Sequence, residues 1–290
     1  LQYLKNHYES NKIDYDSLIQ STKIVGEYTD NYVLDIVVPN YHRDSYCAAT
    51  IKHLIRSLEY LDTPVRYNLI IMSFNDSKLL ESLALENGIV YLYCDKLPTN
   101  HEGKFSRALS FNLPINYFNS SSKWILCHDS DLLVDQQFML NVLNQTKECN
   151  SWIQPYGGRR VSNLSVEDTK ELLEGNFLTL SSLTVSYPNP GAMGGSVLVP
   201  TDLLKNVGGY DPELFWGYGP EDATFWGKLE NTGDAKYSKD TTVYHMNHPP
   251  SYLVDYSKFT FLYQLFVSLT HEDRQDLIKY KRELYSGKFI

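Results

Sequence analysis

Two aspartates one residue apart, Asp129 and Asp131, lie between two apolar stretches of the sequence. The residues WILCH at 124–128 predict a buried strand, so the two carboxylates stand at its end. Like charges at this spacing repel, and burial penalises them further, unless a cation offsets both costs. A hard divalent cation such as Mn²⁺ or Mg²⁺ takes carboxylate oxygens and keeps positions open for diphosphate oxygens and water. The alternative interpretation is a solvated turn, because a D-x-D pattern often occurs by chance.

A second pair of acids, Glu221 and Asp222, ends a segment rich in aromatic residues and glycine, FWGYGPED. A carboxylate here could accept the proton of an attacking hydroxyl, while the rings of Trp216 and Tyr218 could stack on a sugar. The alternative interpretation is that both acids only stabilise the first turn of a helix. The helix dipole lowers the pKa of such acids and burial raises it, so the sequence leaves their basicity open.

Two histidines, His245 and His248, lie in the segment VYHMNHPP, where a short strand is predicted over 241–245. A histidine at the end of a strand is usually a hydrogen-bonded structural residue. With a cation expected at the aspartates, an imidazole becomes a candidate ligand, and either histidine fits that role.

Further polar side chains follow the other predicted strands. In a parallel sheet the carboxyl ends of the strands form the edge at which ligands bind. Arginine near such an edge suits phosphate oxygens because it can contact them with two nitrogens, although most lysines and arginines are only surface residues. The candidates near this edge are Pro39, Asn40, Arg43, Asp76, Lys104 and Arg107.

The elements that must position these residues alternate along the first half of the chain. Strands are predicted over 33–39, 67–74, 89–94 and 124–128, and helices over 45–61, 77–88 and 103–115. This alternation predicts an α/β fold with a mainly parallel central sheet and helices on both faces. The second half is less regular. We expect a strand over 196–200, a helix over 221–233, and one or two amphipathic helices over 251–286.

Composition limits the classes of protein. The chain has 290 residues, 42% of them hydrophobic, and a net charge of −9. This charge and the lack of a long basic run argue against nucleic acid as a partner. Cys47, Cys94, Cys127 and Cys149 form no CxxC pair, which indicates reduced thiols. We find no apolar run of transmembrane length and no signal peptide, and we expect a cytoplasmic protein.

Together these motifs resemble those of GT-A glycosyltransferases, most closely the inverting, family-2-like enzymes. DIVVPNYHRD (35–44) resembles the opening strand whose end holds the nucleotide, and HDSD (128–131) matches the D-x-D element. HEGKFSRALSFNLPI (101–115) is similar to the family's G-K-x-x-A-R-N-x-G helix. The similar segments extend from about Val33 to Pro250.

The second half of the chain carries a more specific resemblance. Residues 191–233 resemble the acceptor-side segment shared by β-1,4-galactosyltransferases, polypeptide N-acetylgalactosaminyltransferases and bacterial chondroitin polymerases. VYHMNHPP is most similar to the chondroitin-polymerase version of the metal-binding segment.

The resemblance implies a role for each candidate. Asp131 and His245 would ligate Mn²⁺ (or Mg²⁺), and Asp129 would contact the metal or the donor sugar. Asp222 would be the general base, and Glu221 would orient the acceptor. The residues implied in binding the nucleotide sugar are Pro39, Asn40, Arg43, Asp76, Lys104, Arg107 and Asp129. Those implied in binding the acceptor are Trp216, Tyr218, Glu221, Gly194 and Gly195.

The same resemblance implies the organisation of the chain and its reaction. A helical lead-in (1–30) would precede a GT-A domain with a nucleotide-sugar half (31–131) and an acceptor half (132–250), followed by a helical extension (251–290). The reaction would be inverting, Mn²⁺-dependent transfer of galactose, N-acetylgalactosamine or glucose from a UDP-sugar to a hydroxyl of a glycan or glycolipid.

Two other functions and one other location stay open. The first is a catalytically degenerate, carbohydrate-binding relative of these enzymes. The second is a metal-dependent nucleotidyltransferase, although the first strand is not followed by the Gly-rich phosphate loop usual there. The helical extension is expected to pack on the catalytic domain. Its alternative role is peripheral contact with a membrane that holds a lipid-linked acceptor.

Overall fold

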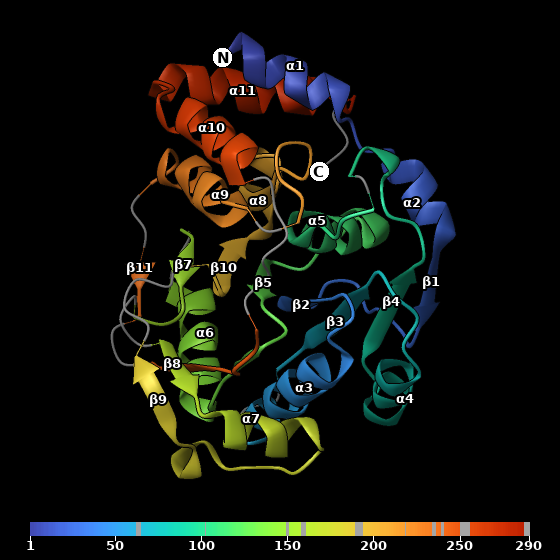
Figure 1. Cartoon of the computed structure of the whole chain (residues 1–290), viewed down its shortest axis with the longest axis vertical. Coiled ribbons are helices and arrows are strands. Elements are labelled where there is room, and N and C mark those ends of the chain that lie inside the picture. Colours follow the sequence, from blue (N-terminus) through green and yellow to red (C-terminus); the bar gives the residue numbers. More distant parts are fainter. Residues whose placement is uncertain are drawn as a thin grey trace.

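The structure is a computed structural model, and it describes residues 1–61, 65–101, 103–148, 151–157, 161–188, 194–217, 219–233, 236–238, 241–249 and 256–286. Its framework is an eight-stranded sheet and a four-stranded sheet (Figure 1). Tyr218 and Cys149 are outside the described residues.

The eight-stranded sheet has the strand order β1-β4-β3-β2-β5-β10-β7-β11. Neighbouring strands are parallel from β4 to β5 and in the pair of β7 and β11, whereas β1 and β10 run antiparallel to the strands beside them. The strands are β1 (Thr22–Val25), β2 (Leu34–Asn40), β3 (Tyr67–Ser73), β4 (Val90–Cys94), β5 (Trp124–His128), β7 (Ile153–Gln154), β10 (Ser196–Pro200) and β11 (Lys236–Tyr237). The predicted mainly parallel sheet is confirmed, and β5 and β10 have the predicted bounds.

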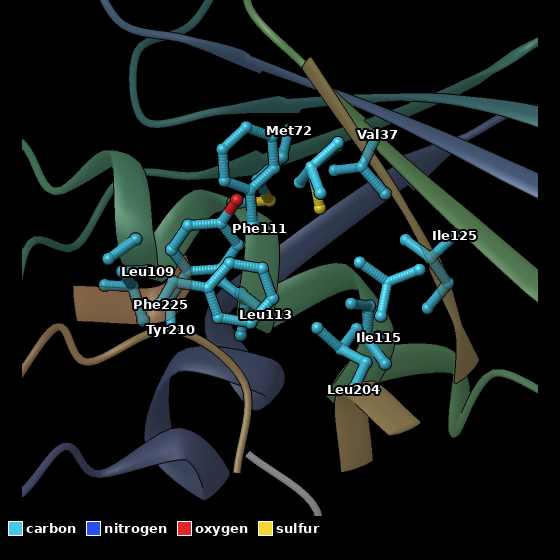
Figure 2. Packing of buried hydrophobic residues seen from close by; sticks show 14 of the residues in the cluster. Val37, Met72, Leu109, Phe111, Leu113, Ile115, Ile125, Leu204, Tyr210 and Phe225 are labelled. Atoms are coloured by element: carbon cyan, nitrogen blue, oxygen red, sulfur yellow. The ribbon is translucent and has the colours of Figure 1, made fainter. Parts of the chain in front are cut away.

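Helices cover both faces of this sheet, as predicted. Because alternate residues of a strand point to opposite faces, Ile36 and Val38 of β2 enter one core and Val37 enters the other. The first core includes α3 (Asp44–Glu59), α4 (Lys78–Asn87) and α6 (Gln136–Glu148). The second includes α2 (Tyr15–Ser21), α5 (Arg107–Phe118), α8 (Thr201–Asn206) and α9 (Glu221–Glu230), and Figure 2 shows part of it.

The four-stranded sheet was not predicted beyond its strand at 243–245. Its order is β6-β12-β8-β9, with β6 (Leu132–Leu133), β8 (Val161–Leu164), β9 (Val185–Pro188) and β12 (Val243–His245). Strands this short show too little alternation to be found in a sequence, and pairing between distant segments decides them. This sheet matters for the site because β6 follows the D-x-D turn directly and β12 ends at a candidate ligand.

The two ends of the chain pack together (Figure 1). Leu4 and Tyr8 share one buried cluster with Phe259 and Leu277 and with residues 214–216. The remaining helices are α1 (Gln2–Ser10), α7 (Val166–Leu173), α10 (Tyr256–Val267), α11 (His271–Leu284) and the 3₁₀ turns η1 (Thr99–His101) and η2 (Leu180–Ser182). The lead-in was expected to be helical, but it also contains β1. Among the helices described, none has the length and apolar composition to cross a membrane.

Candidate active site

The two aspartates lie in the turn between β5 and β6, and buried groups hold this turn. The ring of His128 is fully buried, with Nδ1 3.1 Å from Ser196 Oγ and Nε2 3.2 Å from the carbonyl oxygen of Leu132. The hydroxyl of Thr50 donates to the carbonyl of Ser130 at 2.9 Å. The sequence therefore places both carboxylates on a fixed turn at the carboxyl end of a central strand, as predicted.

Three candidate metal ligands meet at one end of this turn. One ligand atom each from Asp131, His245 and His248 lies within 4.8 Å of the other two. Nε2 of His248 is 3.2 Å from Asp131 Oδ2, and Nε2 of His245 is 3.9 Å from the same oxygen. The sequence left open which histidine is the ligand, and the structure brings both to Asp131. One carboxylate and two imidazoles form a ligand set that suits a transition-metal dication.

The small sheet explains why His245 reaches Asp131. In the β6–β12 pair His245 lies opposite Leu132, and the amide of Met246 donates to the carbonyl of Asp131 at 2.9 Å. Nδ1 of His245 is 3.0 Å from Oδ1 of Asn163 on β8. Because an amide oxygen only accepts, Nδ1 carries the proton and Nε2 offers its lone pair toward Asp131. Asn163 was not predicted, since it lies in a short strand and in no motif.

Arg43 also reaches this cluster. Its Nη1 lies 2.7 Å from Asp131 Oδ2 and 3.2 Å from His248 Nε2. Burial acts to raise the pKa of Asp131. The hydrogen bond from His248, the charge of Arg43 and, when it is protonated, the charge of His245 outweigh burial and lower that pKa to about 2. Asp131 is therefore a carboxylate at neutral pH, which a metal ligand must be.

Arg107 connects the other aspartate to the second acidic pair. It is the first residue of α5, which the side chain of Ser106 caps. Its Nε lies 2.5 Å from Asp129 Oδ1, its Nη1 lies 3.5 Å from Glu221 Oε1, and its Nη2 donates to the carbonyl of Gly194. Arg107 was expected to bind the nucleotide sugar, and in the structure it bridges two acids.

The acids around Arg107 are hard to ionise. Burial raises the pKa of Asp129 to about 7, with Arg107 opposing and Asp131 adding to the shift. Burial also raises the pKa of Glu221 to about 8, with Asp222 adding to the shift and Arg107 opposing it. At Glu221 burial therefore acts in the direction that a proton-holding group requires, against the attraction of Arg107.

Asp222 lies against the glycine pair that precedes β10. A Cβ atom built on Gly194 would be 1.6 Å from Asp222 Oδ2, and one on Gly195 would be 2.4 Å from Leu132 Cδ1. The amide of Asp129 donates to the carbonyl of Gly195 at 2.9 Å. The two glycines thus let the Asp222 carboxylate approach the D-x-D turn, so the predicted residues of both acidic pairs lie in one site.

Trp216 was expected to offer its ring to a sugar, but in the structure the residue is buried. The residue is 3% exposed, and its ring stacks on His101 with 5.0 Å between centroids and has Lys258 Nζ 4.5 Å from its centroid. It presents no open ring face to a sugar, because α10 and η1 pack over it. Its predicted role at the acceptor would require this cluster to open. The predicted role of Tyr218 falls outside the described residues.

The remaining predicted residues lie at the carboxyl ends of β2 and β3 or near them. Pro39 and Asn40 end β2, and Asn40 Nδ2 donates to Asp44 Oδ1 at 2.9 Å and to Ser73 Oγ at 3.0 Å. Asp76 is exposed in the loop between β3 and α4, and Lys104 precedes α5. Their predicted contacts with a nucleotide sugar stay predictions.

Comparisons with known proteins give one family match and several structures of similar fold. Residues 176–249 match the family described as the N-terminal domain of galactosyltransferase. None of the curated proteins compared with the chain matches it in sequence.

Solved structures of glycosyltransferases have the same fold. A variant of Drosophila beta1,4galactosyltransferase 7 with manganese, UDP-Gal and xylobiose is 15% identical over 84% of this chain and 82% of that one, with a TM-score of 0.52. GalNAc-T7 with UDP, GalNAc and Mn²⁺ is 13% identical over 88% and 55%, with a TM-score of 0.53. A mannosyltransferase from Pyrobaculum calidifontis with GDP-Man and Mn²⁺ is 11% identical over 97% and 79%, with a TM-score of 0.52. The chain has the GT-A fold, and together with the family match this indicates a glycosyltransferase.

Proposed function

We propose that this protein is an inverting, Mn²⁺-dependent glycosyltransferase that moves galactose, N-acetylgalactosamine or glucose from a UDP-sugar to a hydroxyl of a glycan. The observation that carries the proposal is the pairing of two unlike sites. One is a carboxylate with two imidazoles, at Asp131, and the other is the Glu221–Asp222 pair; Arg107 pairs with both Asp129 of the D-x-D turn and Glu221.

The donor side would hold a metal and a diphosphate. Asp131, His245 and His248 are the residues that would bind Mn²⁺. The ion, when bound, offsets negative charge on the departing nucleoside diphosphate. The guanidinium of Arg43 lies beside these ligands, where it can exchange its contact with Asp131 for phosphate oxygens. Pro39, Asn40, Asp76 and Lys104 would line the rest of the nucleotide site.

The acceptor side would remove a proton. The Asp222 carboxylate accepts the proton of the attacking hydroxyl, and Glu221 holds the acceptor in place. General base catalysis of this kind typically contributes ~10²–10⁴-fold to the rate. Attack from this side on a sugar whose diphosphate is held on the other side is a single in-line displacement. It inverts the anomeric centre, so an α-linked donor gives a β-linked product.

Different observations support the identity of the donor nucleotide and that of the acceptor. Three of the similar structures hold UDP or UDP-Gal and one holds GDP-Man, which supports a uridine nucleotide over a guanosine nucleotide. Xylobiose in one similar structure supports a glycan acceptor. A glycolipid acceptor with peripheral membrane contact is the alternative, and co-sedimentation of the full chain with liposomes tests it. A cytoplasmic location also stays a prediction.

A screen of UDP-sugars tests the proposed function. UDP release and product formation are measured with and without Mn²⁺, in the wild type and in Asp131→Asn and Asp222→Asn. We expect Mn²⁺-dependent transfer that both variants lose, and NMR of the product should show a β linkage. An α linkage would refute inversion. Binding without turnover by any donor would favour the degenerate, carbohydrate-binding relative, and incorporation of a nucleotide would favour a nucleotidyltransferase.

A further inference from the structure

A buried cluster of charges joins both ends of the chain to the acceptor side of the site. We call it the anchor cluster, and it consists of Tyr8, Asp211, Glu213, Lys228, Lys281 and Tyr285. None of these residues is more than 7% exposed. Two carboxylates face two ammonium groups, so the cluster carries no net charge. Such a cluster requires every partner, because a buried charge that loses its counterion is strongly destabilised.

Lys281 of α11 is the most connected member. Its Nζ donates to the carbonyl of Tyr210 at 2.5 Å and lies 3.0 Å from Asp211 Oδ1 and 3.3 Å from Glu213 Oε2. The hydroxyl of Tyr8 on α1 donates to the same Asp211 oxygen at 2.8 Å. A helix from each end of the chain therefore holds the short segment 210–213.

Lys228 links this segment to the helix that begins with the second acidic pair. It lies on α9, six residues after Asp222. Its Nζ donates to the carbonyl of Gly209 at 2.5 Å and to Asp211 Oδ1 at 2.8 Å. One carboxylate oxygen of Asp211 is thus shared by α1, α9 and α11.

The anchored segment also contacts the helix that carries Arg107. The ring of Tyr210 stacks on Phe225 of α9 at 3.9 Å between centroids and lies 5.1 Å from Phe111 of α5 (Figure 2). Further along, the amide of Gly217 donates to the carbonyl of Phe105 at 2.5 Å, two residues before Arg107. The anchor cluster therefore fixes the two helices whose first residues form the Arg107–Glu221 ion pair.

We propose that Lys281 is a positioning residue for the reaction, which fixes the Glu221–Asp222 pair against Arg107 through Asp211. The inference rests on the proposed function and adds to it that the terminal helices belong to the acceptor side of the catalytic centre. The D-x-D turn has no member in the anchor cluster, since His128, Ser196 and Thr50 hold that turn. Loss of Lys281 should therefore loosen one side of the site and spare the other.

The test is Lys281→Met, with Lys279→Met as the matched control. Lys279 is on the same helix, but its side chain is 74% exposed and pairs only loosely with Glu283, at 3.9 Å. Amide hydrogen exchange is followed in residues 208–222 and in residues 124–133, and kcat, acceptor KM and the Mn²⁺-dependent affinity for UDP are measured in parallel.

In Lys281→Met we expect exchange in 208–222 to become about tenfold faster or more, with 124–133 unchanged. We expect kcat to fall about tenfold or more, while the affinity for UDP stays within about twofold. Lys281→Arg should restore part of the loss because it keeps the charge, and Lys279→Met should match the wild type. Equal acceleration of exchange in both segments, or none in 208–222, would overturn the inference.

A charge-balanced variant covers the case in which Lys281→Met does not fold. Glu213→Gln with Lys281→Met removes one charge of each sign, so its melting temperature should approach that of the wild type. The carbonyl of Tyr210 and the carboxylate of Asp211 still lack the ammonium group of Lys281 in this variant. Amide exchange in 208–222 should therefore stay fast. Full recovery of slow exchange would overturn the inference. A wild type without turnover on any donor would count against the proposed function alone, because the exchange measurements do not depend on turnover.

Discussion

The two acidic sites differ in their balance of charge. Asp131 is surrounded by Arg43, His245 and His248, and its pKa is lowered to about 2. Around Arg107 the balance is reversed, because Asp129 and Glu221 share one guanidinium and both have raised pKa values, of about 7 and about 8. The first arrangement suits a carboxylate that stays ionised on a metal, and the second suits groups that hold or accept a proton. The comparison implies that each side can be damaged separately.

The largest effect is expected from the acceptor side. Asp222→Asn keeps the shape of the side chain but removes the proton acceptor, so kcat should fall by ~10²–10⁴-fold. Because Asp222 contributes nothing to the Asp131 cluster, the affinity for UDP with Mn²⁺, measured by calorimetry, should stay unchanged. A large loss of that affinity would show that the two sides are not separable.

Gly194→Ala should act through the same carboxylate. Its new Cβ would be 1.6 Å from Asp222 Oδ2, so the carboxylate must move. A displacement of about 1 Å at a catalytic group can cost ~10²-fold in kcat. Kinetics of the double variant supply the check: added to Asp222→Asn, Gly194→Ala should cost little more. Full additivity would mean that the glycine matters for another reason.

The donor side should be weakened by Asn163→Ala, which acts through His245. Asn163 accepts from Nδ1 of His245 and so orients Nε2 toward Asp131. Loss of such a partner typically reduces metal affinity by ~10–100-fold. Titration of Mn²⁺ in the presence of UDP measures this, and saturating Mn²⁺ should restore kcat. A defect in kcat that persists at saturation would contradict the assignment.

The raised pKa of Glu221 predicts a dependence of stability on pH. A carboxyl that titrates near pH 8 in the folded chain and near its ordinary value when unfolded stabilises the folded state at low pH, and this stability is lost as pH rises toward 8. Glu221→Gln has no carboxyl to ionise at this position, so it does not lose this stability as the pH rises. Relative to the wild type, the variant should gain on the order of 2 kcal/mol in free energy of unfolding between pH 5 and pH 8.5.

Urea unfolding at both pH values checks this prediction. Glu230→Gln, at the other end of the same helix, is the matched control, and it should track the wild type. If Glu221→Gln gained no free energy of unfolding relative to the wild type, Glu221 would be ionised in the folded chain without loss of stability, because Arg107 offsets its charge.

The smallest effect is expected at the nucleotide edge. Asp76 is exposed, so Asp76→Ala would remove at most one hydrogen bond to the donor. We expect donor KM to rise by ~2–12-fold with kcat unchanged. Donor KM identical to that of the wild type would remove Asp76 from the nucleotide site.

Much of the fold follows from the sequence, and the reasons for the failures are physical. The strands over 67–73 and 124–128 are long apolar runs that the sequence identifies locally. The strands β6, β8 and β12 are two to four residues long and form only because distant segments pair, so the sheet that brings His245 to Asp131 was largely missed.

In the site, too, some features have a local sequence signal and others depend on the packing of distant segments. The sequence motifs singled out Asp131, Asp222 and the two histidines as candidates, and the structure brings Asp131 and the histidines together; their roles stay predictions. Three features depend on the packed chain and have no local signal: the bridge made by Arg107, the bond from Asn163 to His245, and the burial of Trp216 under α10. Trp216 lies in a segment rich in glycine, and Phe259 of α10, which begins 40 residues later, packs against its ring.

Binding of Mn²⁺ tests the central claim most directly. Electron paramagnetic resonance of Mn²⁺ is recorded with UDP in the wild type, Asp131→Asn and Asp222→Asn. We predict one bound ion in the wild type, the same binding in Asp222→Asn, and loss of binding in Asp131→Asn. Undiminished binding of Mn²⁺ by Asp131→Asn would contradict the assignment of the metal to Asp131, His245 and His248.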